Sequence, residues 1–176
     1  GHIAVGMGNL SEGRQVLEQA ITLSAEHRFA TCALLGWRFL AEAELASGSH
    51  EVALEIASSA IEVSQRPEIQ NDYEQYMLVN TKARCLMAID EVRQAGRLLE
   101  GYWPKIVQSA CPPLIAHTAF SIGMLYQKMI AVAPSSAIQA KHRAKSNEFL
   151  AKSKQVWKDL GNPYRIQKVN QVQMNA

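Results

Sequence analysis

The sequence has few of the residues that interrupt helices, and it has no long apolar run. Its 176 residues include only 10 Gly and 6 Pro, and most of these stand where helices are expected to end. No apolar stretch approaches the roughly 18 residues that cross a bilayer as a helix. The start Gly1-His2-Ile3 lacks the basic and apolar regions of a secretory signal. We expect a cytoplasmic protein with no membrane partner and, since position 1 is not Met, a fragment of a larger protein.

Cysteine is also scarce, and Cys32, Cys85 and Cys111 form no paired motif. Their odd number and wide separation argue against a disulfide framework or a metal site. Free cysteines among apolar helical residues usually pack as small core side chains. We therefore expect buried, reduced thiols, as in cytosolic proteins.

Known catalytic motifs are missing. The sequence contains no HExxH, GxSxG, GxGxxG or GxxxxGK[ST] pattern. Glu42 and Glu44 lie two residues apart, so one helix face does not hold both carboxylates. Four histidines lack a second ligand at metal spacing on the same helix: His27, His50, His117 and His142. We expect no enzyme activity, no catalytic residue, no metal and no cofactor.

Charge is unevenly distributed in a chain that has enough apolar residues, 48%, to bury a core. Residues 1–127 hold 9 Lys and Arg against 14 Asp and Glu, a net charge of −5, whereas residues 128–176 hold 9 against 2, a net charge of +7. A basic end can steer an acidic partner, or it can be a solvated helix face that meets a neighbouring domain. No aromatic interleaving accompanies its Lys and Arg, which argues against nucleic acid as the partner.

Apolar residues recur every three or four positions, which predicts helices. The expected helices cover residues 10–25, 27–46, 50–65, 67–88, 92–109, 112–132, 136–160 and 164–172. We expect Ser49 to cap one of them, Pro67 to lie in a first turn, and the segment from Ser136 to Gln139 to form a capping box. Pro104, with a nearby glycine at position 101, should kink or split its helix near residue 103. Gly161 should end the long helix before it.

The helices repeat as pairs. Gly8, Gly48 and Asp90 mark equivalent turns, 40 and 42 residues apart. Small residues follow each turn at matching positions, where close helix crossings are expected: Gly13, Ala53 and Ala95, then Ala20 and Ala60, with Tyr102 at the third position. Leu35-Gly36-x-x-Phe39 is matched by Ile122-Gly123-x-x-Tyr126. The pattern predicts a single domain, 1–176, of helix pairs at 3–25 (partial), 27–65, 68–109 and 112–160, with an amphipathic capping helix at 163–173.

This pattern resembles the tetratricopeptide repeat, a helix–turn–helix unit with a Leu-Gly-x-x-Tyr element and small residues in its second helix. The resemblance implies an all-α fold, a right-handed α-solenoid of stacked antiparallel helix pairs. The period of 40–43 residues, longer than the usual 34, is similar to the divergent repeats of MalT-like bacterial regulators and signalling ATPases. The segment 157–163 is similar to the close of such arms.

The resemblance also implies a concave face formed by the first helix of each pair. Its partner-binding positions would be Trp37, Asp72, Gln75, Lys82, His117, Phe120, Met124, Gln127 and Lys128. Alternatively, Trp37 and Phe120 pack between repeats. Ala33 and Trp37 stand where carboxylate-clamping repeats have Lys and Asn, which argues against binding of chaperone tails. We expect a non-catalytic interaction or scaffolding module, binding a peptide, a partner domain, a neighbouring domain or another copy. The alternative is an effector-sensing arm of a transcription regulator or signalling ATPase or cyclase.

Overall fold

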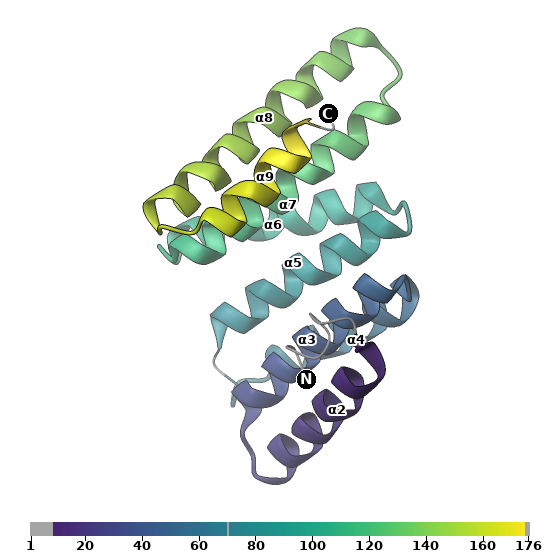
Figure 1. Ribbon diagram of the computed structural model, residues 1–176, viewed down its shortest axis with the longest axis vertical. Coiled ribbons are helices and arrows are strands. Elements are labelled where there is room, and N and C mark those ends of the chain that lie inside the picture. The colour runs from purple at the N-terminus through teal and green to yellow at the C-terminus, as the bar shows by residue number, and fades with distance from the viewer. Residues whose placement is uncertain (1–8, 70, 175–176) are drawn as a thin grey trace. The chain divides into compact units, whose positions relative to one another are not determined.

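The computed structural model describes residues 9–69 and 71–174, and within them the chain is all-helical, with no strand (Figure 1). This confirms the predicted all-α class. None of the described helices is both long enough and apolar enough to cross a membrane. The helices are α2 (Leu10–Glu26), α3 (Ala30–Ser47), α4 (His50–Ser64), α5 (Asp72–Ala88), α6 (Val92–Gln108), α7 (Pro112–Ala131), α8 (Ser136–Asp159) and α9 (Pro163–Met174).

The chain divides into two compact units. Unit 1 covers residues 1–89 and unit 2 covers residues 90–176, so the boundary falls at the turn of the predicted pair 68–109. Within each unit successive helices pack on one another, and in unit 1 α3 also packs on α5. Unit 1 has 6 Lys and Arg against 11 Asp and Glu, a net charge of −5, while unit 2 has 12 against 5, a net charge of +7. The charge asymmetry of the sequence therefore coincides with the division into units.

Three of the predicted helix ends have the backbone that the sequence implied. Gly48 and Asp90 both adopt positive φ, +89° and +61°, at the turns after α3 and α5. Gly161 has φ +65° after α8, and the N–H of Asn162 donates to the carbonyl of Trp157 at 2.9 Å, which satisfies the end of that helix. Gly8, which was predicted at the turn equivalent to those of Gly48 and Asp90, lies outside the described residues.

The predicted start signals of three other helices differ from the structure in part, although α4 and α8 begin at His50 and Ser136 as predicted. Pro67 is not in a first turn, because α5 begins five residues later, where the Asn71 side chain accepts from the N–H of Glu74 at 3.0 Å. The cap of α8 is Ser135, one residue before the predicted Ser136, and its side chain accepts from the N–H of Ile138. The predicted capping box is absent, because the third helical position is then an isoleucine. Ser49 does precede α4, but its side chain makes no capping hydrogen bond. The start of α5 is thus set by the side-chain cap at Asn71 and not by Pro67.

The predicted split near Pro104 is also wrong, since α6 continues through it from Val92 to Gln108. An interior proline costs a helix about 3 kcal/mol. Tertiary contacts on both sides of it can offset that cost. Ile106 is fully buried, and the ring of Trp103 meets the ring of Phe149 edge-on at 5.4 Å. Packing of α6 on α7, together with this ring contact to α8, therefore outweighs the local preference.

The small residues after the turns are buried as predicted, with one exception. Gly13 is buried, and Ala53 and Ala95 are 0% exposed, with Ala60 at 1%. Ala20, by contrast, is exposed, so the prediction of a close crossing there is wrong. Among the described helices, α2 packs mainly on α3, and one packing partner buries only one side of a helix.

The two glycines of the matched Leu-Gly elements contact different neighbours. A Cβ added to Gly36 would lie 2.7 Å from Cγ1 of Ile21, which belongs to the preceding helix α2. A Cβ added to Gly123 would lie 2.6 Å from Cγ of Leu150, which belongs to the following helix α8. Both positions need glycine because a neighbouring helix approaches closely. The two matched motifs nevertheless contact different helices, one before and one after their own in the chain.

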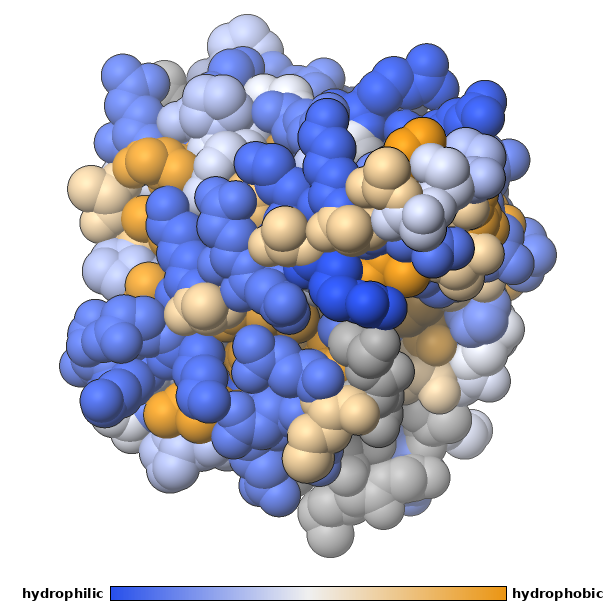
Figure 2. Space-filling view, turned by 90° about the horizontal axis from the view of Figure 1, so that it is seen from above, coloured by the Kyte–Doolittle hydropathy of each residue, from blue (hydrophilic) through white to orange (hydrophobic). Residues whose placement is uncertain are grey.

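Two buried serines tighten the pair formed by α7 and α8. Ser146 Oγ donates to the carbonyl of Gly123 at 2.9 Å, and Ser153 Oγ donates to the carbonyl of Ala116 at 2.8 Å. Seen from above, the face in Figure 2 is largely hydrophilic, with hydrophobic side chains in small separate groups. The apolar content of the chain is used mostly inside the units.

Candidate interaction surfaces

A buried ion pair joins α3 to α5. Arg38, 8% exposed, donates through Nε to Oε2 of Glu74, 7% exposed, at 2.7 Å. Arg38 also donates to Oε1 of Glu42 at 3.3 Å, and Thr81 Oγ1 donates to the same oxygen at 3.4 Å. Burial lowers the pKa of Arg38, but the hydrogen bonds and charges of Glu74 and Glu42 outweigh it, so the pKa lies above its ordinary value. The ion pair therefore fixes α3 beside α5.

One side of α3, next to this ion pair, combines exposed and half-buried residues. Its residues recur at three- and four-residue spacing, which keeps them on one side of a helix. We call this surface the α3 open side; it consists of the exposed Thr31 and Cys32 and the half-buried Leu35, Phe39 and Glu42. The guanidinium of Arg38 lies 4.5 Å from the centre of the Phe39 ring, so the buried ion pair also supports this aromatic side chain.

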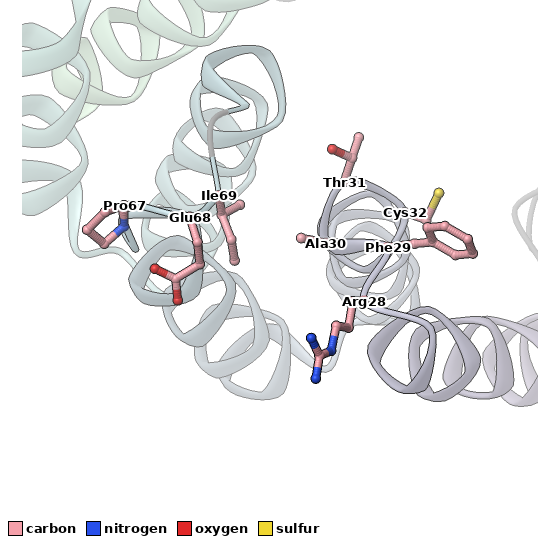
Figure 3. Close-up of a pocket in the computed structure, with 8 residues that line it drawn as sticks. All are labelled: Arg28, Phe29, Ala30, Thr31, Cys32, Pro67, Glu68 and Ile69. Atoms are coloured by element: carbon pink, nitrogen blue, oxygen red, sulfur yellow. The ribbon is translucent and has the colours of Figure 1, made fainter.

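An opening of about 530 Å³ lies between the first turn of α3 and the connection from α4 to α5. Figure 3 shows Ala30 and Arg28 on one side of it and Ile69 and Glu68 on the other, while the side chains of Phe29 and Cys32 project away from that connection. Arg28 and Glu68 are both exposed. The opening is thus a broad cleft with one cation and one anion in contact with water.

The four residues predicted to bind a partner in unit 1 lie on α3 and α5. Trp37 is half-buried, on the side of α3 that also holds the buried Ala33 and Ala41 and lies opposite the α3 open side. Asp72 is exposed at the start of α5. Gln75 and Lys82 are half-buried and seven residues apart, so they share one side of α5. Partner binding by these residues stays a prediction.

In unit 2, the chain's own last helix contacts the predicted positions on α7. The Gln127 side chain donates to the carbonyl of Val172 in α9 at 3.0 Å. Phe120 packs against a buried cluster that includes Trp157 of α8 and a valine of α9, and the His117 ring meets the Trp157 ring edge-on at 5.0 Å. Part of the face predicted for a partner is therefore occupied within the unit.

The remaining two predicted positions differ from one another. Lys128 is exposed, and its Nζ donates to Oδ1 of Asp90 at 2.8 Å. That hydrogen bond, together with the charge of Lys128, holds the pKa of Asp90 below its usual value. Met124 is half-buried. Lys128 thus binds Asp90, the turn residue with positive φ that precedes α6.

Basic side chains of unit 2 lie over aromatic rings. Lys152 Nζ is 5.0 Å from the centre of the Trp103 ring, and the Arg165 guanidinium is 5.7 Å from that of Trp157. A second opening of about 530 Å³ follows the seam between α8 and α9. Its described lining residues are Lys154, Gln167, Asn170, Gln171, Gln173 and Met174. Five of these six residues have polar side chains, and one of the five, Lys154, is basic.

The cysteines do not share one environment. Cys85 is buried, as predicted, and burial raises the pKa of its thiol to about 11. Cys111 is half-buried and Cys32 is exposed on α3, so the prediction of a buried thiol is wrong for Cys32. It lies on the α3 open side, whose described residues are exposed or half-buried. The described residues contain no group of three or more His, Cys, Asp and Glu side chains placed to hold a metal ion.

The chain matches no protein-family model, and the search of curated proteins finds no relative. The resemblance to tetratricopeptide repeats therefore stays a prediction. A functional interpretation depends on the contacts described above.

Sequence reasoning missed the ion pair between Arg38 and Glu74. One signal was present: Arg38 stands inside an apolar helical segment and has Glu42 four residues later, which is the spacing of a helical ion pair. The other partner lies 36 residues further along the chain, and no local pattern indicates that contact.

Proposed function

We propose that this chain is a non-catalytic module that binds a protein or peptide partner, as part of a larger cytosolic protein. The observation that carries the proposal is the α3 open side in unit 1. It presents Leu35 and Phe39, both half-buried, beside an exposed threonine and cysteine. Aromatic side chains such as that of Phe39 are enriched at protein interfaces, where a few residues carry most of the contact energy.

The ion pair under this surface supports the proposal. A binding surface costs less to occupy when its side chains are already fixed. Arg38 is held by Glu74 at 2.7 Å and stacks on Phe39 at 4.5 Å. Phe39 is therefore preorganised, and it is half-buried.

The handedness and the repeat type of the helix pairs are part of the same proposal. We infer that the helix pairs belong to a right-handed array of the tetratricopeptide type. The packing of α3 on both α4 and α5 supports this, as do the equivalent left-handed turns at Gly48 and Asp90. An experimental structure of unit 1 would test this handedness, because the rotation that relates α3 to α5 must be right-handed in such an array.

Photo-cross-linking in the cells that make the protein tests the binding function. A benzoylphenylalanine placed at Leu35 probes the α3 open side, and one at Lys82 probes the side predicted from the sequence. One at Glu55, exposed on α4, is the matched control. We expect a discrete cross-linked product from Leu35 and none from Glu55. Identical patterns at all three positions, or no product at any of them, would contradict the proposal. A product from Lys82 alone would support the sequence-predicted face instead.

The alternative of an effector-sensing arm has less support. A small-molecule site is expected to be enclosed, with polar groups converging inside it. The opening beside α3 has a suitable volume, about 530 Å³, but its charged residues Arg28 and Glu68 are exposed. We therefore propose the binding module first.

A further inference from the structure

The pair formed by α7 and α8 has an apolar seat that holds a helix. Ala116, Leu150 and Trp157 form a buried cluster, and Phe120 packs against it. The helix seated there is α9, whose Val169 is 1% exposed and completes the cluster. Figure 1 shows α9 lying along α7 and α8. We call the four residues from α7 and α8 the helix seat.

The seated helix has a simple amphipathic pattern. Ile166 and Val172 also pack against the cluster, so the apolar side of α9 has aliphatic residues at positions i, i+3 and i+6, which share one side of a helix. Gln167 and Gln171 are exposed on the polar side. Any helix with this spacing of branched aliphatic residues and a polar outer side would present the same surface to the seat.

Contacts at both ends of α9 also define the direction in which it lies on the helix seat. The first turn of α9 is near Trp157, because Arg165 lies over that ring at 5.7 Å. The last turn is near Gln127, whose side chain donates to the carbonyl of Val172 at 3.0 Å. Since His117 contacts Trp157, α9 runs in the same direction as α7. Gln127 binds a main-chain carbonyl, a contact that any helix ending there could make.

The seat holds α9 by few contacts. Val169 is the only residue of α9 that is buried. For comparison, α5, which packs on α3 and α4 in unit 1, buries eleven residues. Elements with few buried apolar contacts are those that open locally at low free energy. α9 should therefore leave its seat far more readily than α7 and α8 separate from each other.

We propose that α9 is an exchangeable occupant, and that the helix seat receives an amphipathic helix of a partner protein with aliphatic residues at i, i+3 and i+6. This inference rests on the proposed binding function and names the chemistry of one partner. It concerns unit 2, whereas the cross-linking experiment concerns α3 in unit 1, so each can fail without the other.

Competition with the chain's own helix tests the proposal. The probe is a fluorescein-labelled peptide of residues 162–174, and binding is followed by fluorescence anisotropy. In the full chain, Val169→Asp places a charge in the apolar cluster and should release α9 from the seat. We expect this variant to bind the peptide at least about tenfold more tightly than wild type does, because burial of a valine side chain corresponds to a factor of that order.

Two controls make the result specific. Gln167→Asp in the full chain adds the same charge on the exposed side of α9, and it should bind the peptide as weakly as wild type. A peptide that carries Val169→Asp should not bind the released seat. A folded Val169→Asp chain that fails to bind the wild-type peptide would overturn the proposal. A wild-type dimer that this substitution abolishes would also overturn it, since the occupant would then be α9 of a second copy.

Hydrogen exchange on the wild-type chain keeps the proposal testable if Val169→Asp does not fold. We expect the amides of residues 166–174 to exchange at least about tenfold faster than those in the middle of α7, because local opening of α9 should not require global unfolding. Equal protection of α7 and α9 would show that α9 is a fixed part of the unit, and the proposal would be wrong.

Discussion

Removal of Glu74 should destabilise unit 1 strongly. Glu74→Leu leaves the buried Arg38 with only Glu42, at 3.3 Å, as an acidic partner. At an effective dielectric constant of about 20, two charges about 4 Å apart interact by roughly 4 kcal/mol. Breaking a buried ion pair at one end typically costs about 3–5 kcal/mol. We expect Glu74→Leu near the lower end of that range, because Glu42 still compensates part of the charge of Arg38.

Arg38→Met should cost more, because it leaves two carboxylates without their cation. The double variant Arg38→Met/Glu74→Leu should recover most of the loss, since apolar residues replace both members of the buried pair and only Glu42, which is half-buried, is left without its cation. The free energy of unfolding can be measured from urea titrations followed by circular dichroism. For a unit of this size a loss of 3 kcal/mol lowers the melting temperature by at least about 12 °C.

The control is an exposed ion pair in unit 2. Lys145 and Glu148 lie 3.5 Å apart, with side chains 44% and 63% exposed, so Lys145→Met should change stability by less than about 0.5 kcal/mol. A loss below 1 kcal/mol for Glu74→Leu would refute the reasoning. So would a double variant whose loss equals the sum of the two single losses, because residues in one ion pair should not act independently.

Three further outcomes follow from local contacts. Gly123→Ala should cost about 1–3 kcal/mol in thermal unfolding, because the new Cβ would lie 2.6 Å from a leucine of α8. With a thiol reagent at pH 8, Cys32 should react in the native protein and Cys85, whose pKa is raised to about 11, only after unfolding. Lys128→Met should return the pKa of Asp90 to its usual value in carboxylate NMR titrations. Because the folded-state pKa of Asp90 is depressed, its stabilising contribution is present above the unfolded pKa and is lost as pH falls through the folded one.

A specific result would contradict each of these three predictions. Gly101→Ala is the control for the first, since nothing lies within 4 Å of its new Cβ; equal losses at both glycines would exclude steric overlap as the cause. Fast labelling of Cys85 in the native state would contradict its burial. An Asp90 pKa that stays low without Lys128 would require another source of positive charge.

The sequence was sufficient to predict features that depend on local backbone chemistry. Gly48 and Gly161 end their helices as predicted because a left-handed residue is needed there. Pro67 was misinterpreted because a proline suits both a first helical turn and a loop. The true start, at Asp72, follows a better cap at Asn71. Where two local signals compete, the sequence alone does not decide between them.

Side-chain environments were harder to predict because they depend on which neighbour approaches. Gly36 and Gly123 occupy matching motifs, yet one contacts α2 and the other α8. For Trp37 the sequence left two interpretations open, a partner-binding face or packing between repeats, and the residue shares its side of α3 with buried alanines. The contact between Arg38 and Glu74 joins residues far apart in sequence. Such choices are made by tertiary packing, which a periodic pattern does not encode.

The separation of charge between the units has a practical consequence. With net charges of −5 and +7, the two halves have isoelectric points on opposite sides of neutrality. A protease that cuts near residue 89 would release fragments that migrate in opposite directions in an electric field at pH 7. One would be retained by an anion exchanger and the other by a cation exchanger. The intact chain, at +2, would conceal both behaviours, and raising the salt concentration would weaken each of them.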